Sequence, residues 1–460
     1  LRVQVGGLHE QLLAVLPFDL TAAQRRVSEE IAGDLTRQVP MHRLLQGDVG
    51  SGKTVVAALA AAQAMDAGWQ CALMAPTEIL AEQHFRKLVQ WIEPVLPSGT
   101  RVAWLTGSQK KKERLAMLSA VESGEALLVV GTHAVIQQDV KFQRLGLAII
   151  DEQHRFGVEQ RLTLRRKTQQ AQQADGVQEP HMLMMSATPI PRTLAMAHYA
   201  DLEVSTLDEL PPGRTPVLTR LVADHRRGEL IERMRAQIAQ GRQVYWVCPL
   251  IEESEALDLS NATETHRLLS QALNPESQPA VLVGLLHSRM PPAEKKAVMD
   301  LFSRGDMAVL VSTTVIEVGV DVPNASLMVI EHAERFGLSQ LHQLRGRVGR
   351  GAVASACVLL YSGGEGGRLS DTARERLRAM VETADGFEIA RRDLEIRGPG
   401  EFLGARQSGA ALLRFADLQV DIEWLEWARR TAPLMLERHP ELARDHLHRW
   451  LGQRHDYLKA

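Results

Sequence analysis

Short apolar runs alternate with segments of helical periodicity along most of the chain. In the first half, runs of apolar and β-branched residues predict buried strands at 71–76, 101–106, 126–132, 147–152 and 181–188. Helical patterns, for example at 54–67 and 78–92, stand between several of these runs. Continuous apolar strands with intervening helices are typical of a mostly parallel sheet that helices cover on both faces. The first half is therefore predicted to be an α/β domain.

The second half repeats this rhythm, and the end of the chain does not. Further apolar runs predict strands at 243–250, 280–288, 307–314, 326–331 and 354–362. Between the halves, the Pro-rich and charged segment 208–216 indicates a linker. After about residue 365 only helical patterns remain, with a stretch interrupted by Gly and Pro at 395–409. We therefore expect α/β domains at 1–207 and 217–365, and a helical region at 366–460.

Composition and charge exclude several classes of protein. The 460 residues are 45% hydrophobic, 24% charged and 4% aromatic, as in globular domains, and the net charge of -3 means that any basic surface must be local. The three cysteines lie far apart in the sequence, which argues against a disulfide framework and favours a reducing cytoplasm. The sequence shows no signal peptide and no long uncharged apolar run, so we expect no membrane partner.

A glycine-rich motif near residue 50 predicts a nucleotide site. The segment 47–54 fits G-x-x-x-x-G-K-T, and a helical pattern follows it. In such a loop, backbone N–H groups surround phosphates at a helix N-terminus. The Lys53 ammonium would reach the β- and γ-phosphates, and the Thr54 hydroxyl would bind Mg²⁺. An ordinary glycine-rich turn is the alternative, which the spacing and the following helix disfavour. The candidate residues are Gly47, Asp48, Val49, Gly50, Ser51, Gly52, Lys53 and Thr54.

Two carboxylates at the end of a predicted strand complete this candidate site. Asp151 and Glu152 follow four apolar residues. Asp151 is placed to orient the Mg²⁺ shell, and Glu152 to polarise the attacking water. A simple cap of the strand end is the alternative. Upstream, Phe18 could stack on adenine and Gln24 could bind the adenine edge, although this signal is weak alone.

The stretch "RFGLSQLHQLRGRVGRG" at 335–351 predicts an anion site. It contains four arginines, four glycines and no carboxylate, and the guanidinium fork fits phosphate oxygens. The anion could be a nucleotide phosphate or a nucleic-acid backbone.

An ordered series of motifs resembles that of superfamily 2 helicases, and more narrowly the helicase portion of the RecG family. The motifs include "APTEILAEQH", "LTGS", "GTHAVIQ", "DEQHRFG", "MSATPIPRTLA", "VSTTVIEVGVDVPNA" and the arginine-rich stretch above. The resemblance extends from about residue 16 to about residue 410. It implies an α/β fold with two tandem RecA-like P-loop NTPase domains that have parallel sheets, followed by a C-terminal helical region. ATP and Mg²⁺ are the implied cofactors.

The resemblance also implies roles for individual residues. Arg347 and Arg350 would contact the γ-phosphate, and Gln343 would place the water or sense that phosphate; Gly319 and Asp321 belong to the nucleotide site. His342 and Arg345 could face DNA or the translocation motif. The implied DNA-binding residues are Thr77, Thr106, Gly107, Thr132, His133, His287, Arg289 and Thr313. The implied coupling residues are Gln153, His154, Ser186, Ala187 and Thr188, together with Arg391, Arg397, Glu401 and Gln407 of a translocation-motif hairpin at 386–409.

The function implied by the resemblance is ATP-driven translocation on double-stranded DNA that remodels branched DNA, namely fork regression and Holliday junction branch migration in repair and recombination. The implied partners are forks and Holliday junctions, with a single-stranded DNA-binding protein as a further candidate. We expect a monomer in the bacterial cytoplasm, associated with the nucleoid. The family carries an N-terminal wedge domain, and this sequence starts where the helicase region begins. We therefore expect weak junction specificity unless that domain is supplied.

Three alternatives stay open from the sequence. The transcription-repair coupling factor Mfd shares the later motifs and would add RNA polymerase as a partner. A nucleotide-gated switch would bind ATP without turnover, although it would need damage to residues that are intact here, such as Asp151, Glu152, Arg347 and Arg350. RNA instead of DNA is the third possibility.

Overall fold

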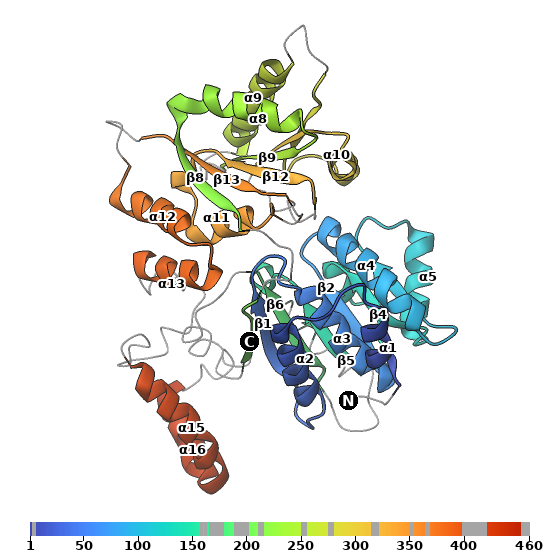
Figure 1. Cartoon of the computed structure of the whole chain (residues 1–460). Coiled ribbons are helices and arrows are strands. Elements are labelled where there is room, and N and C mark those ends of the chain that lie inside the picture. Colours follow the sequence, from blue (N-terminus) through green and yellow to red (C-terminus); the bar gives the residue numbers. More distant parts are fainter. Residues whose placement is uncertain are drawn as a thin grey trace. The chain divides into compact units, whose positions relative to one another are not determined.

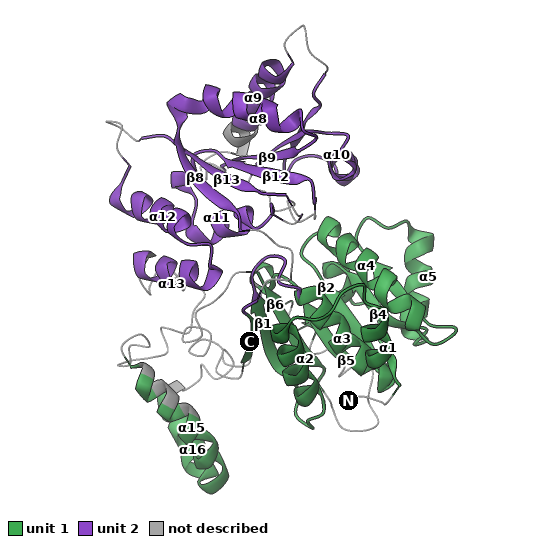
Figure 2. Cartoon of the chain, in the orientation of Figure 1, with its two compact units in different colours: residues 1–46, 53–207, 397–460 green, residues 47–52, 208–396 purple. Residues whose placement is uncertain are grey.

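The protein consists of two compact units. The computed structural model describes residues 1, 6–156, 160, 163–164, 179–187, 202–209, 216–249, 255–274, 280–313, 322–349, 351, 353–363, 369–397 and 421–451. Unit 1 comprises Leu1–Gln46, Lys53–Leu207 and Arg397–Ala460, and unit 2 comprises Gly47–Gly52 and Asp208–Ile396 (Figure 2). Each unit contains one sheet with helices against it (Figure 1). The parallel α/β fold expected of both halves is confirmed.

The sheet of unit 1 has seven strands in the order β3-β4-β2-β5-β6-β1-β7. Every neighbouring pair from β3 to β1 is parallel. The five strands predicted for this half are present, because their runs of apolar residues are buried on both faces of the sheet. The strands are β1 (His42–Gly47), β2 (Gln70–Met74), β3 (Arg101–Leu105), β4 (Ala126–Gly131), β5 (Leu145–Ile150), β6 (His181–Ser186) and β7 (Glu203–Leu207).

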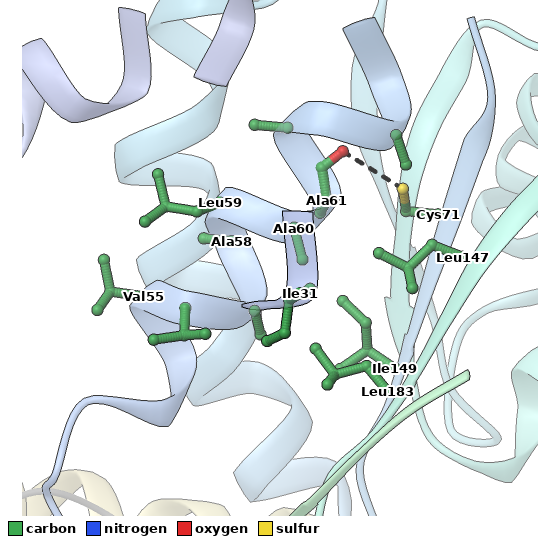
Figure 3. Packing of buried hydrophobic residues seen from close by; sticks show 14 of the residues in the cluster. Ile31, Val55, Ala58, Leu59, Ala60, Ala61, Cys71, Leu147, Ile149 and Leu183 are labelled. Atoms are coloured by element: carbon green, nitrogen blue, oxygen red, sulfur yellow. Dashed lines mark hydrogen bonds between the residues drawn. The ribbon is translucent and has the colours of Figure 1, made fainter. Parts of the chain in front are cut away.

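Alternate side chains of these strands enter two separate cores. On one face, Cys71, Leu147 and Ile149 pack against helices that include α3 (Figure 3). Helix α3 is buried from Val55 to Met65, and its many alanines allow close packing on all sides. The helices of unit 1 are α1 (Leu8–Val15), α2 (Ala22–Leu35), α3 (Lys53–Asp66), α4 (Glu78–Ile92), α5 (Lys111–Glu122), α15 (Ile422–Arg438) and α16 (Pro440–Leu451), with short turns η1 (Glu93–Val95), η2 (His133–Ile136) and η3 (Gln153–Arg155).

The sheet of unit 2 has six strands in the order β10-β11-β9-β12-β13-β8, and all neighbouring pairs are parallel. Its core combines strand residues such as Trp246 and Val311 with Met234 and Leu269 from two helices. The strands are β8 (Leu218–Ala223), β9 (Gln243–Cys248), β10 (Val283–Leu286), β11 (Val309–Thr313), β12 (Ala325–Ile330) and β13 (Ala356–Tyr361). The helices are α8 (Arg227–Ile238), α9 (Glu255–Leu273), α10 (Pro292–Arg304), α11 (Leu338–Arg345), α12 (Asp371–Glu382) and α13 (Gly386–Arg397), with turns η4 (Asp224–Arg226) and η5 (Ala333–Arg335).

The three cysteines lie in buried strands of the two sheets, as the sequence predicted. Cys71 is in β2, Cys248 in β9 and Cys357 in β13, and none forms a disulfide. Burial raises the pKa of Cys71, and it raises the pKa of Cys357 to about 12. Both thiols are therefore protonated at neutral pH.

Only helices follow β13 in the part of the chain that the structure describes. They are α12, α13, α15 and α16, in agreement with the expected helical region after about residue 365. Among the described residues, no helix is both long enough and apolar enough to cross a bilayer.

Candidate functional site

The glycine-rich loop connects β1 with α3 and has the backbone of a phosphate cradle. Gly50 and Gly52 have φ angles of 82° and 93°, in a region that strongly favours glycine. The Ser51 N–H donates to the Asp48 carbonyl at 3.0 Å, which closes the turn. Lys53 is the first residue of α3, so the N–H groups of the helix start and the Lys53 side chain belong to the same turn. The geometry fits the predicted phosphate loop.

Asp151 follows β5, and both of its carboxylate oxygens accept hydrogen bonds. Oδ1 accepts from the Glu152 N–H at 3.0 Å, and Oδ2 lies 2.7 Å from His84 Nε2. Burial alone would raise the pKa of Asp151. The contact with His84, the charge of Lys53 and the Glu152 N–H outweigh burial and lower this pKa. Asp151 is therefore ionised at neutral pH.

Glu152 has an unusual backbone conformation. Its φ and ψ angles are 50° and 53°, in the left-handed region that non-glycine residues seldom adopt. The same turn recurs in unit 2, where His332 follows β12 with a φ of 49°. In both units this residue is followed by a short 3-10 turn that ends at a buried phenylalanine, Phe156 or Phe336. The conformation is therefore a property of how the chain leaves this strand in both sheets.

The carboxylate that precedes this turn differs between the two units. In unit 2 it is the buried Glu331, which pairs with Arg227 and accepts hydrogen bonds from Trp246 Nε1 at 3.3 Å and Thr265 Oγ1 at 3.2 Å. The Glu331 carboxylate is therefore already paired with residues of unit 2. Asp151 lies in the unit whose helix α3 begins with Lys53, so it is the carboxylate suited to a metal.

The residues present fit Mg²⁺. Among the described residues, no group of three or more His, Cys, Asp or Glu side chains could hold a metal by itself. Mg²⁺ typically takes one or two protein oxygens and completes its shell with phosphates and water. The Thr54 hydroxyl in the first turn of α3 and the ionised Asp151 carboxylate are hard oxygen donors of this kind.

The two candidate adenine contacts have different surroundings. Phe18 is 45% exposed, and its ring meets Trp91 edge-on with centroids 6.0 Å apart. Gln24 is buried and belongs to a capping box at the start of α2, where its Oε1 accepts from the Thr21 N–H at 3.0 Å. Phe18 thus presents an aromatic surface, while the amide oxygen of Gln24 is already used by the helix cap.

Several predicted DNA contacts are hydroxyls at strand ends. Thr77 caps α4 through its Oγ1, which accepts from the Leu80 N–H at 3.3 Å. Thr106 and Thr132 are almost fully buried, yet neither Oγ1 has a hydrogen-bond partner in the described part of the chain. Buried polar atoms without partners are uncommon in folded proteins. Of their neighbours, Gly107 and His133 are exposed.

Unit 2 shows the same feature at the ends of β10 and β11. Thr313 Oγ1 and Ser312 Oγ are buried and, within the described ranges, have no hydrogen-bond partner. His287 follows β10, and its Nδ1 also has no partner there. Burial and the nearby cations Lys295 and Arg289 lower the pKa of His287. Arg289 itself is exposed.

Arg345 lies at the end of α11 and is buried. This bears on whether its side chain faces DNA or the translocation motif. Its guanidinium donates to the carbonyls of Met380 and Thr383, both at 2.9 Å, and of Ala384 at 3.1 Å. It also lies 3.0 Å from His342 Nδ1. Arg345 therefore contacts the backbone that leads into the 386–409 segment, and it is not exposed to DNA.

His342 and Ser339 give α11 two further contacts within unit 2. His342 Nε2 lies 2.8 Å from Asp48 Oδ1 of the glycine-rich loop, which is grouped with this unit. Ser339 Oγ donates to Asp393 Oδ2 of α13 at 3.0 Å. Gln343 and Arg347, both partly buried, lie on the same short stretch. Helix α11 thus touches both the phosphate loop and α13.

The first half of the predicted translocation motif is helix α13. Arg391 is exposed there and pairs with Glu388, with 2.7 Å between Nη2 and Oε1. Of the other coupling candidates, Gln153, Ser186 and Ala187 are buried at the ends of β5 and β6. Outside the described residues lie Thr188, Gly319, Asp321, Arg350, Glu401 and Gln407, and the side chains of His154 and Arg397.

We expect replacement of Arg345 to loosen α13. In Arg345→Met, the carbonyls of Met380, Thr383 and Ala384 lose their donor, and that of Met380 is buried. A buried carbonyl left without a donor costs about 1–3 kcal/mol, so amides of residues 385–397 should exchange with solvent roughly 5- to 150-fold faster. Hydrogen–deuterium exchange measures this. Arg378→Met is the control, because the Arg378 side chain is 77% exposed. Equal exchange in the two variants would show that Arg345 does not hold this segment.

Residues 21–197 match the DEAD/DEAH box helicase family, and residues 227–352 match the helicase conserved C-terminal domain. Residues 383–455 match the C-terminal part of domain 3 of the ATP-dependent DNA helicase RecG.

Individual relatives agree with these matches. The ATP-dependent DNA helicase RecG of Escherichia coli O157:H7 is 56% identical over 455 residues, which are 99% of this chain and 63% of that protein. The RecG of Thermotoga maritima is 48% identical over 424 residues, which are 92% of this chain and 52% of that protein. A solved structure of RecG bound to a three-way DNA junction is 44% identical, with a TM-score of 0.72 over 93% of this chain and 53% of that chain. The chain thus spans about half to two thirds of the length of these relatives.

Proposed function

Because this chain belongs to the RecG family of ATP-dependent DNA helicases, we propose that it is an ATP-driven translocase on double-stranded DNA that remodels branched DNA. Fork regression and Holliday junction branch migration, in repair and recombination, are the proposed tasks. The observation that carries the proposal is the 56% identity to a RecG helicase over 99% of the chain. The 44% identity to a RecG that was solved on a three-way DNA junction supports branched DNA as the partner.

In this proposal, the glycine-rich loop and the start of α3 bind the nucleotide, and the residues after β5 hold the metal and activate water. The N–H groups of the loop Gly47–Gly52 and the Lys53 ammonium bind the phosphates, and Phe18 stacks on the base. Thr54 and Asp151 hold Mg²⁺, which when bound neutralises charge on the phosphate oxygens. Glu152 accepts the proton of the attacking water. The lowered pKa of Asp151 supports its part, because only the ionised carboxylate binds a cation.

The proposed DNA track runs over the strand-end hydroxyls. Thr106, Thr132 and Thr313 have buried hydroxyls without partners among the residues that the structure describes, and phosphate oxygens would satisfy them. Thr77, Gly107, His133, His287 and Arg289 are the further proposed contacts. Contacts of this type fix the position of a duplex without reading its sequence, which fits a motor that moves along DNA of any sequence.

The proposed coupling path links nucleotide state to DNA movement. Gln343, Arg347 and Arg350 sense the γ-phosphate, and Gly319 and Asp321 contribute to the same site. Gln153, His154 and the residues Ser186–Thr188 transmit the state of the nucleotide within the first domain. The 386–409 segment, with Arg391, Arg397, Glu401 and Gln407, moves the duplex. The contacts of α11 with Asp393 and with the backbone before α13 support this last link.

The remaining proposals concern organisation and location. We propose domains at 1–207 and 217–365 with a linker at 208–216, and a helical region at 366–460. We further propose a monomer in the cytoplasm, associated with the nucleoid. A single-stranded DNA-binding protein is its proposed protein partner.

Steady-state ATP hydrolysis with and without DNA tests the proposed function. We expect a low rate without DNA, a higher rate with linear duplex and the highest rate with a three-way junction. Hydrolysis by Lys53→Ala gives the background of the assay, because that variant loses the ammonium that binds the phosphates. A rate that is the same with and without DNA would rule out the motor, and stimulation by RNA alone would replace DNA as the track.

A further inference from the structure

One buried side chain next to the nucleotide site has no place in the mechanism above. Helix α4 is amphipathic, and its buried residues are Ala81, His84, Leu88 and Ile92. This spacing forms one stripe along the helix. The stripe is apolar except at His84, whose side chain is only 7% exposed. Burying an imidazole costs free energy unless it is hydrogen-bonded, so the contacts of His84 need an explanation.

The partner of His84 is Asp151. His84 Nε2 lies 2.7 Å from Asp151 Oδ2. A carboxylate that binds a cation only accepts hydrogen bonds, so at this distance the imidazole would donate through Nε2–H. The other oxygen, Oδ1, accepts from the Glu152 N–H at 3.0 Å. Two donors from different elements therefore fix the rotation of this carboxylate.

The fold gives this contact a defined geometry. Strand β2 leads into α4 and pairs directly with β5, and the Asp151 N–H donates to the Met74 carbonyl at the end of β2. The start of α4 is fixed as well, because the Glu78 carboxylate accepts from Ser108 N–H at 3.1 Å and from Ser108 Oγ at 2.6 Å. The pairing of β2 with β5 and the contacts at the start of α4 therefore fix the distance between His84 and Asp151.

We infer that His84 is a positioning residue that orients the Asp151 carboxylate for magnesium-bound nucleotide. This inference rests on the proposed function, in which Asp151 holds Mg²⁺. Residues that orient metal ligands in this way typically change metal affinity or activity by about 10–100-fold when they are replaced. Without the His84 donor, Asp151 Oδ2 loses a hydrogen bond, and only the Glu152 N–H on Oδ1 still restrains the rotation of the carboxylate.

Two replacements of His84 separate orientation from packing. In His84→Gln, the amide nitrogen is as many bonds from Cβ as the histidine Nε2 is, so a hydrogen-bond donor is kept at this position. In His84→Leu, the side chain fills similar space without a donor. Arg86→Ala is the matched control on the same helix, because the Arg86 side chain is 66% exposed and pairs with Glu82. Thermal unfolding without ligand establishes that each variant is folded.

The measurement is the affinity for ADP over a series of Mg²⁺ concentrations, determined by titration calorimetry on the full chain without DNA. The affinity for ADP should increase with the Mg²⁺ concentration. We expect the Mg²⁺ concentration that gives half of this increase to be about 10–100-fold higher in His84→Leu than in the unaltered chain. It should stay near the unaltered value in His84→Gln and Arg86→Ala. If His84→Leu does not fold, His84→Asn replaces it, since its amide is too short to reach Oδ2.

The inference is overturned if the folded variant without a donor binds ADP with unaltered Mg²⁺ dependence, or if His84→Gln fails as badly as His84→Leu. Either result would leave His84 as a packing residue. The proposed function fails in a different experiment, namely when DNA does not stimulate ATP hydrolysis by the unaltered chain. The Mg²⁺ titration does not depend on hydrolysis, so the two failures are distinguishable.

Discussion

Replacing Arg347 or Arg350 with alanine is expected to reduce ATP turnover by a factor of about 10³–10⁵ and to leave ATP binding largely intact. An arginine on the γ-phosphate stabilises charge that develops only in the transition state, so its loss affects kcat more than ground-state affinity. The contact between His342 Nε2 and Asp48 Oδ1 supports this role for Arg347, because His342 and Arg347 belong to the same short stretch of unit 2.

Turnover and binding must be measured separately to test this role. Steady-state hydrolysis with saturating junction DNA gives kcat, and titration with a non-hydrolysable ATP analogue gives the affinity. Arg374→Ala is the control, since the Arg374 side chain is 61% exposed and pairs with Asp371 within α12. Unchanged kcat would assign the arginines to the DNA backbone instead. In that case the salt dependence of DNA binding should become weaker in the variants.

The sequence predicted every inner strand except β1, because a strand buried on both faces has a continuous apolar run. It did not predict β1, in which only Leu44 and Leu45 are apolar, nor β7 and β8, which lie at sheet edges. In β7 the apolar pattern is interrupted by Glu203, Ser205 and Thr206. In β8 two leucines, Leu218 and Leu221, are exposed, so the apolar positions do not mark the buried face. Edge strands carry mixed residues because one side of each is open to other contacts.

The candidate nucleotide site was predictable because its chemistry is local in sequence. The glycines, Lys53 and Thr54 lie within eight consecutive residues, and Asp151 and Glu152 are adjacent. The contacts that support these residues are not local. His84 is 67 residues from Asp151, and Arg345 is 35 residues from Met380. The histidine in the apolar stripe of α4 indicates a buried polar contact from the sequence alone. That its partner is Asp151 follows only from the order of the strands in the sheet.

The net charge of -3 gave no sign of a nucleic-acid partner, and the structure suggests why. The proposed DNA contacts are mostly hydroxyls and backbone turns at strand ends, such as Thr106, Thr132 and Thr313, which carry no formal charge. Contacts of this kind do not appear in the net charge, so composition says little about the proposed track.

Replacing Glu152 with glutamine is expected to lower ATP turnover by a factor of about 10²–10⁴, the usual contribution of a general base. Glutamine has nearly the same shape and fills the same buried space, so the left-handed turn at this position should persist. Because Glu152 does not hold the metal in our proposal, binding of ATP with Mg²⁺ should remain. Single-turnover hydrolysis and titration with the non-hydrolysable analogue measure the two effects.

Asp151→Asn is the matched comparison for Glu152→Gln, because it also removes one charge from an adjacent buried carboxylate. It should weaken nucleotide binding in a Mg²⁺-dependent manner, since the amide is a poorer ligand than the ionised carboxylate. The two variants therefore separate water activation from metal binding. If Glu152→Gln weakened Mg²⁺-dependent binding and Asp151→Asn slowed only hydrolysis, the two roles would have to be exchanged. The buried contact between His84 and Asp151 would then orient the group that activates water.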